Sequence, residues 1–295
     1  MVVLENDLLK AEISLHGAEL RSLVRKDKGL SYLWNADPAY WARVSPVLFP
    51  FVGSVKNKTY RVGDRQYPMG QHGFARDREF ELISQTSDEA WFALTDDEQT
   101  RAVYPFAFCL EIGYRLEGAG IRVMWNVTNP GTEPLYFSIG AHPAFLCPPG
   151  EKQDLTSCRV TFYDRDGVSP KELAVRKLGE GGLVSDRTER LPLTHGCLPV
   201  TDELFAKDAL ILENHQVQQI GLADEKGREF VRVHFEAPLA GVWSPAGKHA
   251  PFICIEPWYG RCDAEAFDGE LKDREWGNCL ESGACFEASY EIITG

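Results

Sequence analysis

The sequence has little positive charge for its size. Its 295 residues include 31 Lys and Arg against 44 Asp and Glu, which gives a formal net charge of -13 at pH 7. Because nucleic acids and anionic bilayers both attract basic surfaces, this balance argues against either as a partner. A neutral small molecule, or a ligand held in a locally positive pocket, is compatible with the composition.

Long apolar runs are also missing. No segment approaches the roughly 18 consecutive apolar residues of a membrane span. The opening MVVLENDLLKAEISLHGAEL has neither a basic start nor a continuous apolar stretch. The sequence therefore predicts a cytoplasmic protein without a secretory signal, in which the sequons at Asn57 and Asn126 carry no glycan.

Closely spaced cysteine pairs and nucleotide motifs are absent as well. None of the eight cysteines forms a CxxC pair, so free thiols are expected. Cys254, Glu256 and Cys262 are neighbours in sequence, but no ligand spacing of a zinc site follows, and no metal is predicted. The sequence also lacks the GxSxG, P-loop and GxGxxG motifs. These motifs usually mark a hydrolase nucleophile elbow, a nucleotide site and a dinucleotide site, so none of the three is indicated.

Alternation with a period of two is the dominant pattern. It is clearest in FCLEIGYRL (108–116) and IRVMWNV (121–127), and the glycine-bearing EGAG between them predicts a β-hairpin. Further strands are expected within residues 8–24, 90–94, 228–236 and 288–294.

Helical patterns are few and short. Residues 95–105 and 201–210 favour one short helix each, with Thr95 and Thr201 as N-caps. Strands do not alternate with helices, so a parallel sheet is not expected. We predict an all-β fold, a large antiparallel sandwich with a few short helices, in one domain over residues 1–295, with residues 148–190 as loop-like insertions.

Three stretches combine titratable side chains with glycine or proline. They are MGQHGFARDREF (69–80), SIGAHPAF (138–145) and PFICIEPWYGRCD (251–263). Glu256 ends an apolar run, where a buried carboxylate is costly unless it is paired or used. Trp258 offers a flat apolar face of the kind that packs on a sugar ring. The candidate site residues in these stretches are His72, Arg76, His142, Glu256 and Trp258.

Each candidate also has an ordinary structural explanation. A lone histidine in an apolar strand is usually a core residue, Glu256 can pair with Arg261, and Arg76 can pair with Asp77 or Glu79. The combination is more informative, because two histidines and one carboxylate make a complete acid–base set.

An ordered series of motifs resembles the aldose 1-epimerase (mutarotase) superfamily, and most of all its bacterial branch of LacX-type proteins. The series spans about residues 15 to 265 and consists of GAEL, YLWN (32–35), PVLFPFVGSVKNKTY (46–60), HGFARD (72–77), GAHPAF (140–145), LFAKDALI (204–211) and VWSP…APFICIEPWYGRCD (242–263).

The resemblance implies a β-supersandwich that interconverts the α and β anomers of an aldose without a metal or organic cofactor. Carried onto the matching positions, it makes Glu256 the general base and His142 the general acid at the ring oxygen. His72 becomes a second ligand near that oxygen, and Asp208 a substrate-binding residue.

One position departs from the family pattern. Many galactose mutarotases carry a sugar-binding arginine in GRxxNR, but this chain has GSVKNK with Ser54 at that position. Arg76 is the candidate to replace this contact, and it could equally hold a phosphate. The partner is therefore a small aldohexose, free or phosphorylated, bound by a monomer or homodimer.

Three alternatives stay open at this point. The first is a hexose-6-phosphate 1-epimerase, and the second is a carbohydrate-binding protein of the same fold without turnover. The third is a lyase or glycosidase, which usually needs two carboxylates across the bond; only Asp208 is available to join Glu256.

Overall fold

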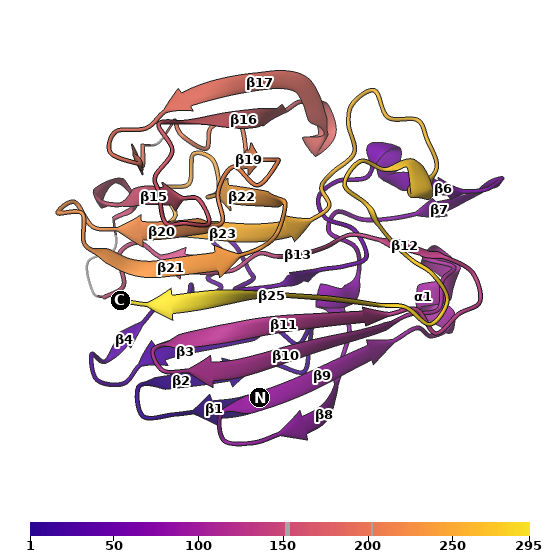
Figure 1. Cartoon of the computed structure of the whole chain (residues 1–295), viewed down its shortest axis with the longest axis horizontal. Helices are drawn as coiled ribbons and strands as arrows, with labels where there is room; N and C mark the ends of the chain where they lie inside the picture. Colours follow the sequence, from indigo (N-terminus) through magenta and orange to yellow (C-terminus); the bar gives the residue numbers. More distant parts are fainter. Residues whose placement is uncertain (151–153, 202) are drawn as a thin grey trace.

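In the computed structural model, which describes residues 1–150, 154–201 and 203–295, the chain forms two large sheets and several small ones (Figure 1). The all-β prediction is confirmed, and the ladders between the named strands are antiparallel, as alternating short strands joined by tight turns require.

The first large sheet, which we call the first sheet, contains the predicted hairpin near its middle. In order across the sheet, its strands are β18 (Cys197–Pro199), β15 (Arg159–Tyr163), β20 (Gln219–Ala223), β21 (Glu229–Phe235), β25 (Cys285–Thr294), β11 (Gly120–Thr128), β10 (Cys109–Glu117), β9 (Glu89–Thr95) and β8 (Glu81–Gln85).

The second large sheet, called the second sheet below, carries two of the three stretches singled out in the sequence. Its strands in order are β17 (Val184–Pro192), β16 (Glu172–Leu178), β19 (Leu210–Leu212), β22 (Leu239–Trp243), β23 (Phe252–Tyr259), β13 (Ile139–Ala141) and β5 (Val47–Leu48), and β14 (Ala144–Leu146) also pairs with β23.

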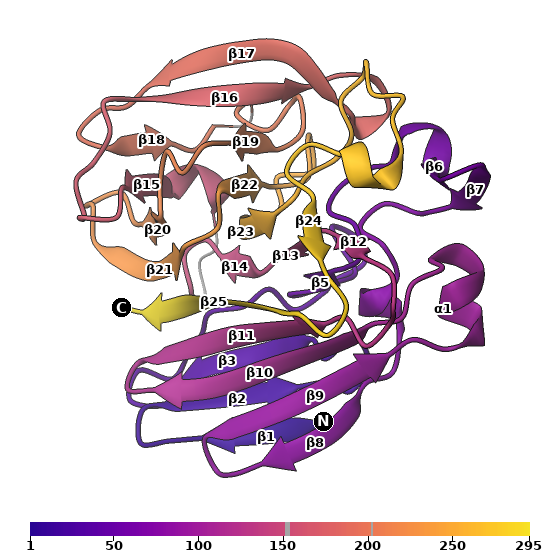
Figure 2. The same ribbon diagram turned by 45° about the vertical axis from the view of Figure 1, so that its right-hand side comes forward.

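Small sheets and short helices complete the architecture. In both views the indigo N-terminal strands lie behind the magenta strands β9 to β11 (Figures 1 and 2). These elements are β1 (Val2–Glu5), β2 (Leu9–Ile13), β3 (Leu20–Arg25), β4 (Leu30–Ser31), β6 (Thr59–Val62), β7 (Arg65–Pro68), β12 (Leu135–Phe137), β24 (Asn278–Leu280), α1 (Glu98–Val103) and the 3-10 turns η1 (Lys56–Lys58), η2 (Ala75–Asp77), η3 (Leu155–Ser157), η4 (Glu180–Gly182) and η5 (Leu271–Asp273).

The predicted hairpin forms with the register that its alternation requires. Ile112 lies opposite Trp125 and Tyr114 opposite Val123, and all four side chains are buried. The turn between β10 and β11 places Gly118 at φ +58°, a left-handed conformation that glycine adopts at little cost.

Both faces of β23 are buried, which explains why its sequence is apolar on both sides of the strand except at Glu256. Ile253 and Ile255 join the main hydrophobic core, which also contains residues of the first sheet. Successive side chains of a strand point to opposite faces, so Cys254, Glu256 and Trp258 lie on the other face of the second sheet.

The helix predictions need correction. Residues 95–105 do form a short helix, but it begins at Glu98, and its N-cap is Asp97 in a capping box with Thr100. Thr95 is not the cap because it is the last residue of β9 and pairs with Cys109.

Residues 201–210 do not form the second predicted helix. The described residues 203–208 make turns, Leu210 begins β19, and Asp202 lies outside the described residues. The turns end at Asp208, whose φ of +74° is incompatible with a continuing α-helix.

The loop-like prediction for residues 148–190 is also wrong where strands form, and residues 151–153 lie outside the described ranges. Strands β15, β16 and the first part of β17 occupy this region. The exposed polar face of β17 hides its strand character, because most of its side chains contact solvent rather than alternating between core and solvent.

No helix in the described ranges has the length and apolar character needed to cross a bilayer. The main core draws residues from Val2 near one end to Ile292 near the other. On this basis we propose that residues 1–295 fold as one domain.

Candidate active site

A pocket of about 380 Å³ lies on the face of the second sheet that carries Glu256 and Trp258. All six residues singled out by the sequence line it, although they come from four distant segments. The pocket is lined by Trp41, Arg43, Gly53, Gln71, His72, Arg76, His142, Leu178, Gly182, Asp208, Ala209, Ile211, Trp243, Glu256, Trp258 and Cys262.

Glu256 is held by the middle of β23, opposite Gly241 of β22. Its side chain is 1% exposed. Trp258, two residues further along, lies across two glycines of neighbouring strands. A Cβ at Gly241 would be 2.5 Å from the Trp258 ring and one at Gly140 would be 2.6 Å from it, so both glycines make room for the indole.

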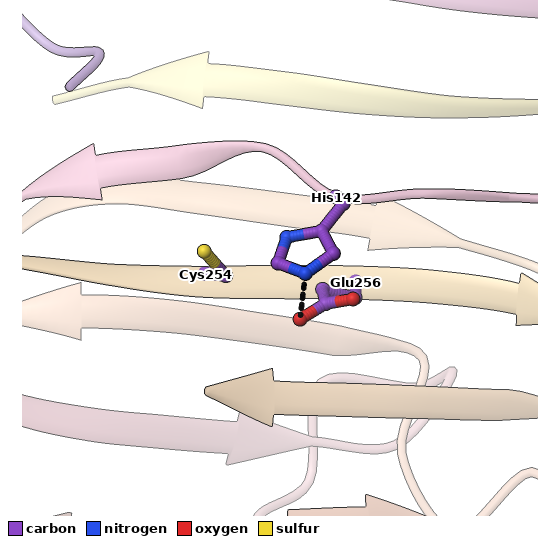
Figure 3. Close-up of side chains that lie close together, drawn as sticks. All are labelled: His142, Cys254 and Glu256. Atoms are coloured by element: carbon purple, nitrogen blue, oxygen red, sulfur yellow. Dashed lines mark ion pairs between the residues drawn. The ribbon is translucent and has the colours of Figure 1, made fainter. Parts of the chain in front are cut away.

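His142 occupies a break between two strands that pair with the same neighbour. Gly140 of β13 lies opposite Trp258, and Ala144 of β14 lies opposite Cys254, so the interruption at His142 and its following proline falls beside Glu256. The imidazole Nε2 is 3.4 Å from Glu256 Oε1 (Figure 3). The interrupted strand is therefore what turns the histidine toward the carboxyl group.

Two tryptophans hold the His142 ring. Trp41 stacks on it with ring centroids 4.7 Å apart and planes at 28°, and Trp243 meets it edge-on at 5.4 Å. Sequence reasoning missed both residues and Arg43. The loop around Trp41 and Arg43 has no strand or helix periodicity, so the sequence carries no signal for their position.

His72 is positioned by a reciprocal pair of hydrogen bonds with Gly53. The His72 backbone N–H donates to the Gly53 carbonyl at 3.0 Å, and the Gly53 N–H donates to His72 Nδ1 at 3.1 Å. Because Nδ1 accepts this bond, the proton of the neutral imidazole is on Nε2. His72 therefore presents its Nε2–H as a donor, and its ring lies edge-on to that of His142 with centroids 5.6 Å apart.

Arg76 and Arg43 form one wall of the pocket. Arg76 lies in η2 and donates from one terminal nitrogen to the Gln71 carbonyl at 2.8 Å. Arg43 donates to Asp77 at 2.8 Å. Ser54, where the family arginine would stand, does not line the pocket, whereas Arg76 does.

Asp208 lines the same pocket, and its negative charge acts on Glu256. Asp208 is exposed, and one of its carboxylate oxygens accepts a hydrogen bond from the Ala209 N–H at 2.8 Å. The positive φ of Asp208 turns the chain from the preceding loop into β19.

Burial dominates the ionisation of the central pair. It raises the pKa of Glu256 well above its ordinary value, and the charge of Asp208 adds to this effect, while the adjacent Trp258 indole acts weakly in the opposite direction. Burial also lowers the pKa of His142 to about 3, helped by the positive charge of Arg76. The pair is therefore most stable with no net charge and one proton to share.

Unpartnered polar atoms gather in this pocket. Among the buried side-chain atoms of the described residues that lack a hydrogen-bond partner are Arg76 Nε, His142 Nδ1, Glu256 Oε2 and Trp258 Nε1, all from lining residues. Buried polar groups without partners are rare and costly. Their concentration here indicates a site built for a polar ligand.

One group of side chains has the chemistry of metal ligands. One ligand atom from each of His142, Cys254 and Glu256 lies within 4.8 Å of the others (Figure 3). Tetrahedral zinc holds its ligand atoms roughly 3.3–3.8 Å apart for its usual bond lengths, a range that the 3.4 Å between His142 Nε2 and Glu256 Oε1 meets. Burial, followed by the charge of Glu256, raises the pKa of the Cys254 thiol, so the set favours protons over a resident cation.

Comparisons with known proteins identify the family of this chain. Residues 1–270 match the family model described as aldose 1-epimerase. The chromosomally encoded protein LacX of Lactococcus lactis subsp. lactis is 35% identical over 269 residues, which cover 88% of this chain and 87% of LacX. The chain belongs to the aldose 1-epimerase family. As a member it is an isomerase, and its similarity to LacX assigns it to the LacX-like branch.

Solved structures of two relatives share its fold over the full chain. The galactose mutarotase related enzyme of Lactobacillus acidophilus superposes with a TM-score of 0.91 at 33% identity, covering 100% of this chain and 97% of that chain. The galactose mutarotase-like protein of Lactobacillus casei has a TM-score of 0.92 at 29% identity, with 100% of both chains covered. The predicted β-supersandwich is thus confirmed as a galactose mutarotase-like fold.

Proposed function

We propose that this aldose 1-epimerase family member interconverts the α and β anomers of an aldohexose by acid–base ring opening, with Glu256 as base and His142 as acid. The contact of 3.4 Å between His142 Nε2 and Glu256 Oε1, in a pocket rich in unpartnered polar atoms, carries the proposal. No organic cofactor or metal takes part in the proposed steps.

The reaction begins with one proton transfer inside the pair. Moving the shared proton from Glu256 to His142 creates a carboxylate and an imidazolium without changing the net charge of the site. The carboxylate then removes the proton from the C1 hydroxyl, the bond between C1 and the ring oxygen breaks, and the imidazolium protonates that oxygen. Rotation about C1–C2 and the reverse transfers close the ring as the other anomer and restore the pair.

The remaining residues orient the sugar. In this proposal the Nε2–H of His72, whose Nδ1 accepts the Gly53 N–H, donates to the ring oxygen, where negative charge develops as the bond breaks. The unpartnered N–H of Trp258, together with Arg76 and Asp208, is available to the sugar hydroxyls. A cytoplasmic location and a monomeric or homodimeric state stay predictions of the sequence.

Optical rotation tests the proposal. Fresh α-D-glucose or α-D-galactose is followed with wild type, Glu256→Gln and His142→Asn, alongside the exposed control variants Glu287→Gln and His195→Asn. We expect wild type and the controls to speed equilibration and each site variant to lose about 10²–10⁴-fold in rate. A sugar that binds without faster equilibration would instead assign a carbohydrate-binding role.

A further inference from the structure

The GAEL motif near the N-terminus contains a buried carboxylate that the proposed mechanism does not use. The side chain of Glu19 is 10% exposed. One of its oxygens accepts the backbone N–H groups of Val44 at 2.8 Å and Ser45 at 2.9 Å, and the other accepts a hydrogen bond from Arg21 at 2.8 Å. Hydrogen bonds to an ionised acceptor are stronger than neutral ones, so Glu19 fixes the backbone at these two residues.

This backbone runs beside the segment that carries His142. Strand β5 pairs with β13, and further along the Ala144 N–H donates to the Val44 carbonyl at 2.9 Å. Pro46 and Pro143 lie between these two contacts and interrupt the pairing, because proline has no N–H to donate. The backbone beside His142 is therefore held by the carboxylate of the GAEL motif rather than by a continuous ladder.

The same loop carries the tryptophan that stacks on His142. Trp41 precedes Val44 by three residues, and its carbonyl accepts the Trp34 indole N–H at 2.9 Å. The loop is thus fixed by Trp34 at one end and by Glu19 at the other. A shift of the loop would change the contact between the Trp41 and His142 rings, whose centroids are 4.7 Å apart.

The turn that presents Glu19 is itself packed against η2. The Gly17 N–H donates to the Arg78 carbonyl at 2.7 Å. A Cβ at Gly17 would lie 2.8 Å from the carbonyl oxygen of Arg76, and its φ of +69° also favours glycine. The charge of Glu19 acts on Arg76. The motif therefore contacts both the loop of Trp41 and the turn that carries Arg76, two segments that line the pocket.

We propose that Glu19 is a positioning residue for anomerisation, which holds the loop of Trp41 and thereby the orientation of the His142 ring. The inference rests on the proposed function for the role of His142 as the acid. Glu19 is not among the residues that line the pocket, so it acts through the loop and not by touching the sugar. Without its carboxylate, two buried N–H groups lose their acceptor, and the loop must move to satisfy them.

Polarimetry compares wild type with Glu19→Ala and Glu19→Gln on the sugar that wild type anomerises. We expect Glu19→Ala to lower kcat by about three- to tenfold, because the contact between Trp41 and His142 is lost. Glu19→Gln should keep most of the rate, since its amide oxygen still accepts both N–H groups. Glu229→Ala is the matched control, because it removes a carboxylate that accepts two hydroxyl groups on the first sheet.

A double variant separates positioning from general destabilisation, with each protein assayed below its melting temperature. If Glu19 acts through Trp41, Glu19→Ala combined with Trp41→Leu should lose no more rate than the larger of the two single losses, because both changes remove the same contact. Losses that multiply in the double variant would overturn the inference.

NMR of the imidazole signals gives a readout that does not depend on turnover. The ring current of Trp41 shifts the signals of His142, and His142→Asn identifies them among the 7 histidines. We expect Glu19→Ala and Trp41→Leu to move these signals in the same direction, and Glu229→Ala to leave them in place. Unchanged His142 signals in Glu19→Ala would show that Glu19 does not position the ring.

The two readouts also separate this inference from the proposed function. If the His142 signals move in Glu19→Ala but wild type anomerises no sugar, the placement of His142 by Glu19 stands and the proposed function alone fails. If Glu19→Ala does not fold, Glu19→Asp provides the same comparison, because its carboxylate is one methylene shorter and no longer reaches both N–H groups.

Discussion

The indole of Trp41 lies against the imidazole of His142, with ring centroids 4.7 Å apart. Aromatic pairs of this kind contribute roughly 0.5–1.5 kcal/mol beyond the area they bury. Trp41 comes from a loop far from His142 in sequence. The orientation of the His142 ring, the proposed acid, therefore depends on a segment without regular structure.

Replacing Trp41 by Leu should therefore lower kcat for anomerisation by about three- to tenfold, since the ring of His142 loses the surface that orients it. Trp41→Phe should recover most of the rate. The measurement is polarimetry on both variants, with Trp91→Leu on the first sheet as the control. Equal rates for wild type and Trp41→Leu would show that Trp243 alone positions the histidine.

Glu256→Gln should be more stable than wild type at alkaline pH. The folded state raises the pKa of Glu256, so wild type loses stability as pH rises from about 4.5 toward that raised value, and glutamine has no proton to lose. Denaturant unfolding from pH 4.5 to pH 9 should show the advantage of the variant growing with pH.

His142→Asn should show the opposite trend. The pKa of His142 falls to about 3 in the folded state, so wild type loses stability as pH decreases from 6.5 toward 3, whereas asparagine does not titrate. The advantage of this variant should grow on acidification. If the two groups instead formed a stable ion pair, both variants would be less stable than wild type at neutral pH, and the neutral description of the pair would be wrong.

Gly241→Ala should displace Trp258. The added methyl carbon would lie 2.5 Å from the indole, well inside contact distance, and overpacking of this kind costs about 1–3 kcal/mol. We expect a lower melting temperature and a higher KM for the sugar. Gly70→Ala is the matched control, because a Cβ there meets nothing within 4 Å. If Gly241→Ala kept the wild-type KM, Trp258 would not be a sugar contact.

Chelation should leave the reaction unchanged. Burial raises the pKa of the Cys254 thiol, and a thiol that keeps its proton is a poor metal ligand. Activity after dialysis against EDTA should equal that of the untreated protein, and Cys254→Ser should retain it. The opposite result would be a loss of activity on chelation that zinc restores in wild type but not in Cys254→Ser. That result would show that this cluster is a metal centre.

Much of the fold could be read from local patterns. The hairpin of β10 and β11 has side chains that alternate between core and solvent, so the sequence contains both its faces and its turn. The same reasoning failed at residues 201–210, where a helical pattern is overridden by Leu210, which pairs within the second sheet as part of β19. It failed again at β17, whose polar edge position removes the alternation.

The candidate site shows the same division. Glycine and proline beside His72, His142 and Glu256 marked these residues in the sequence, because such backbone fixes where a side chain can point. Nothing local marked Trp41 or Arg43, since their loop acquires its position by packing against His142 and Asp77.

By itself, the sequence determined the antiparallel all-β class, the family and the residue types of an acid–base set, since these depend on periodicity and on short motifs. The tertiary structure decided that His142 meets Glu256, that Trp258 rests on Gly140 and Gly241, and that two arginines share one wall. Distances between residues of different segments depend on how sheets pair and pack, and no local pattern in the chain encodes them.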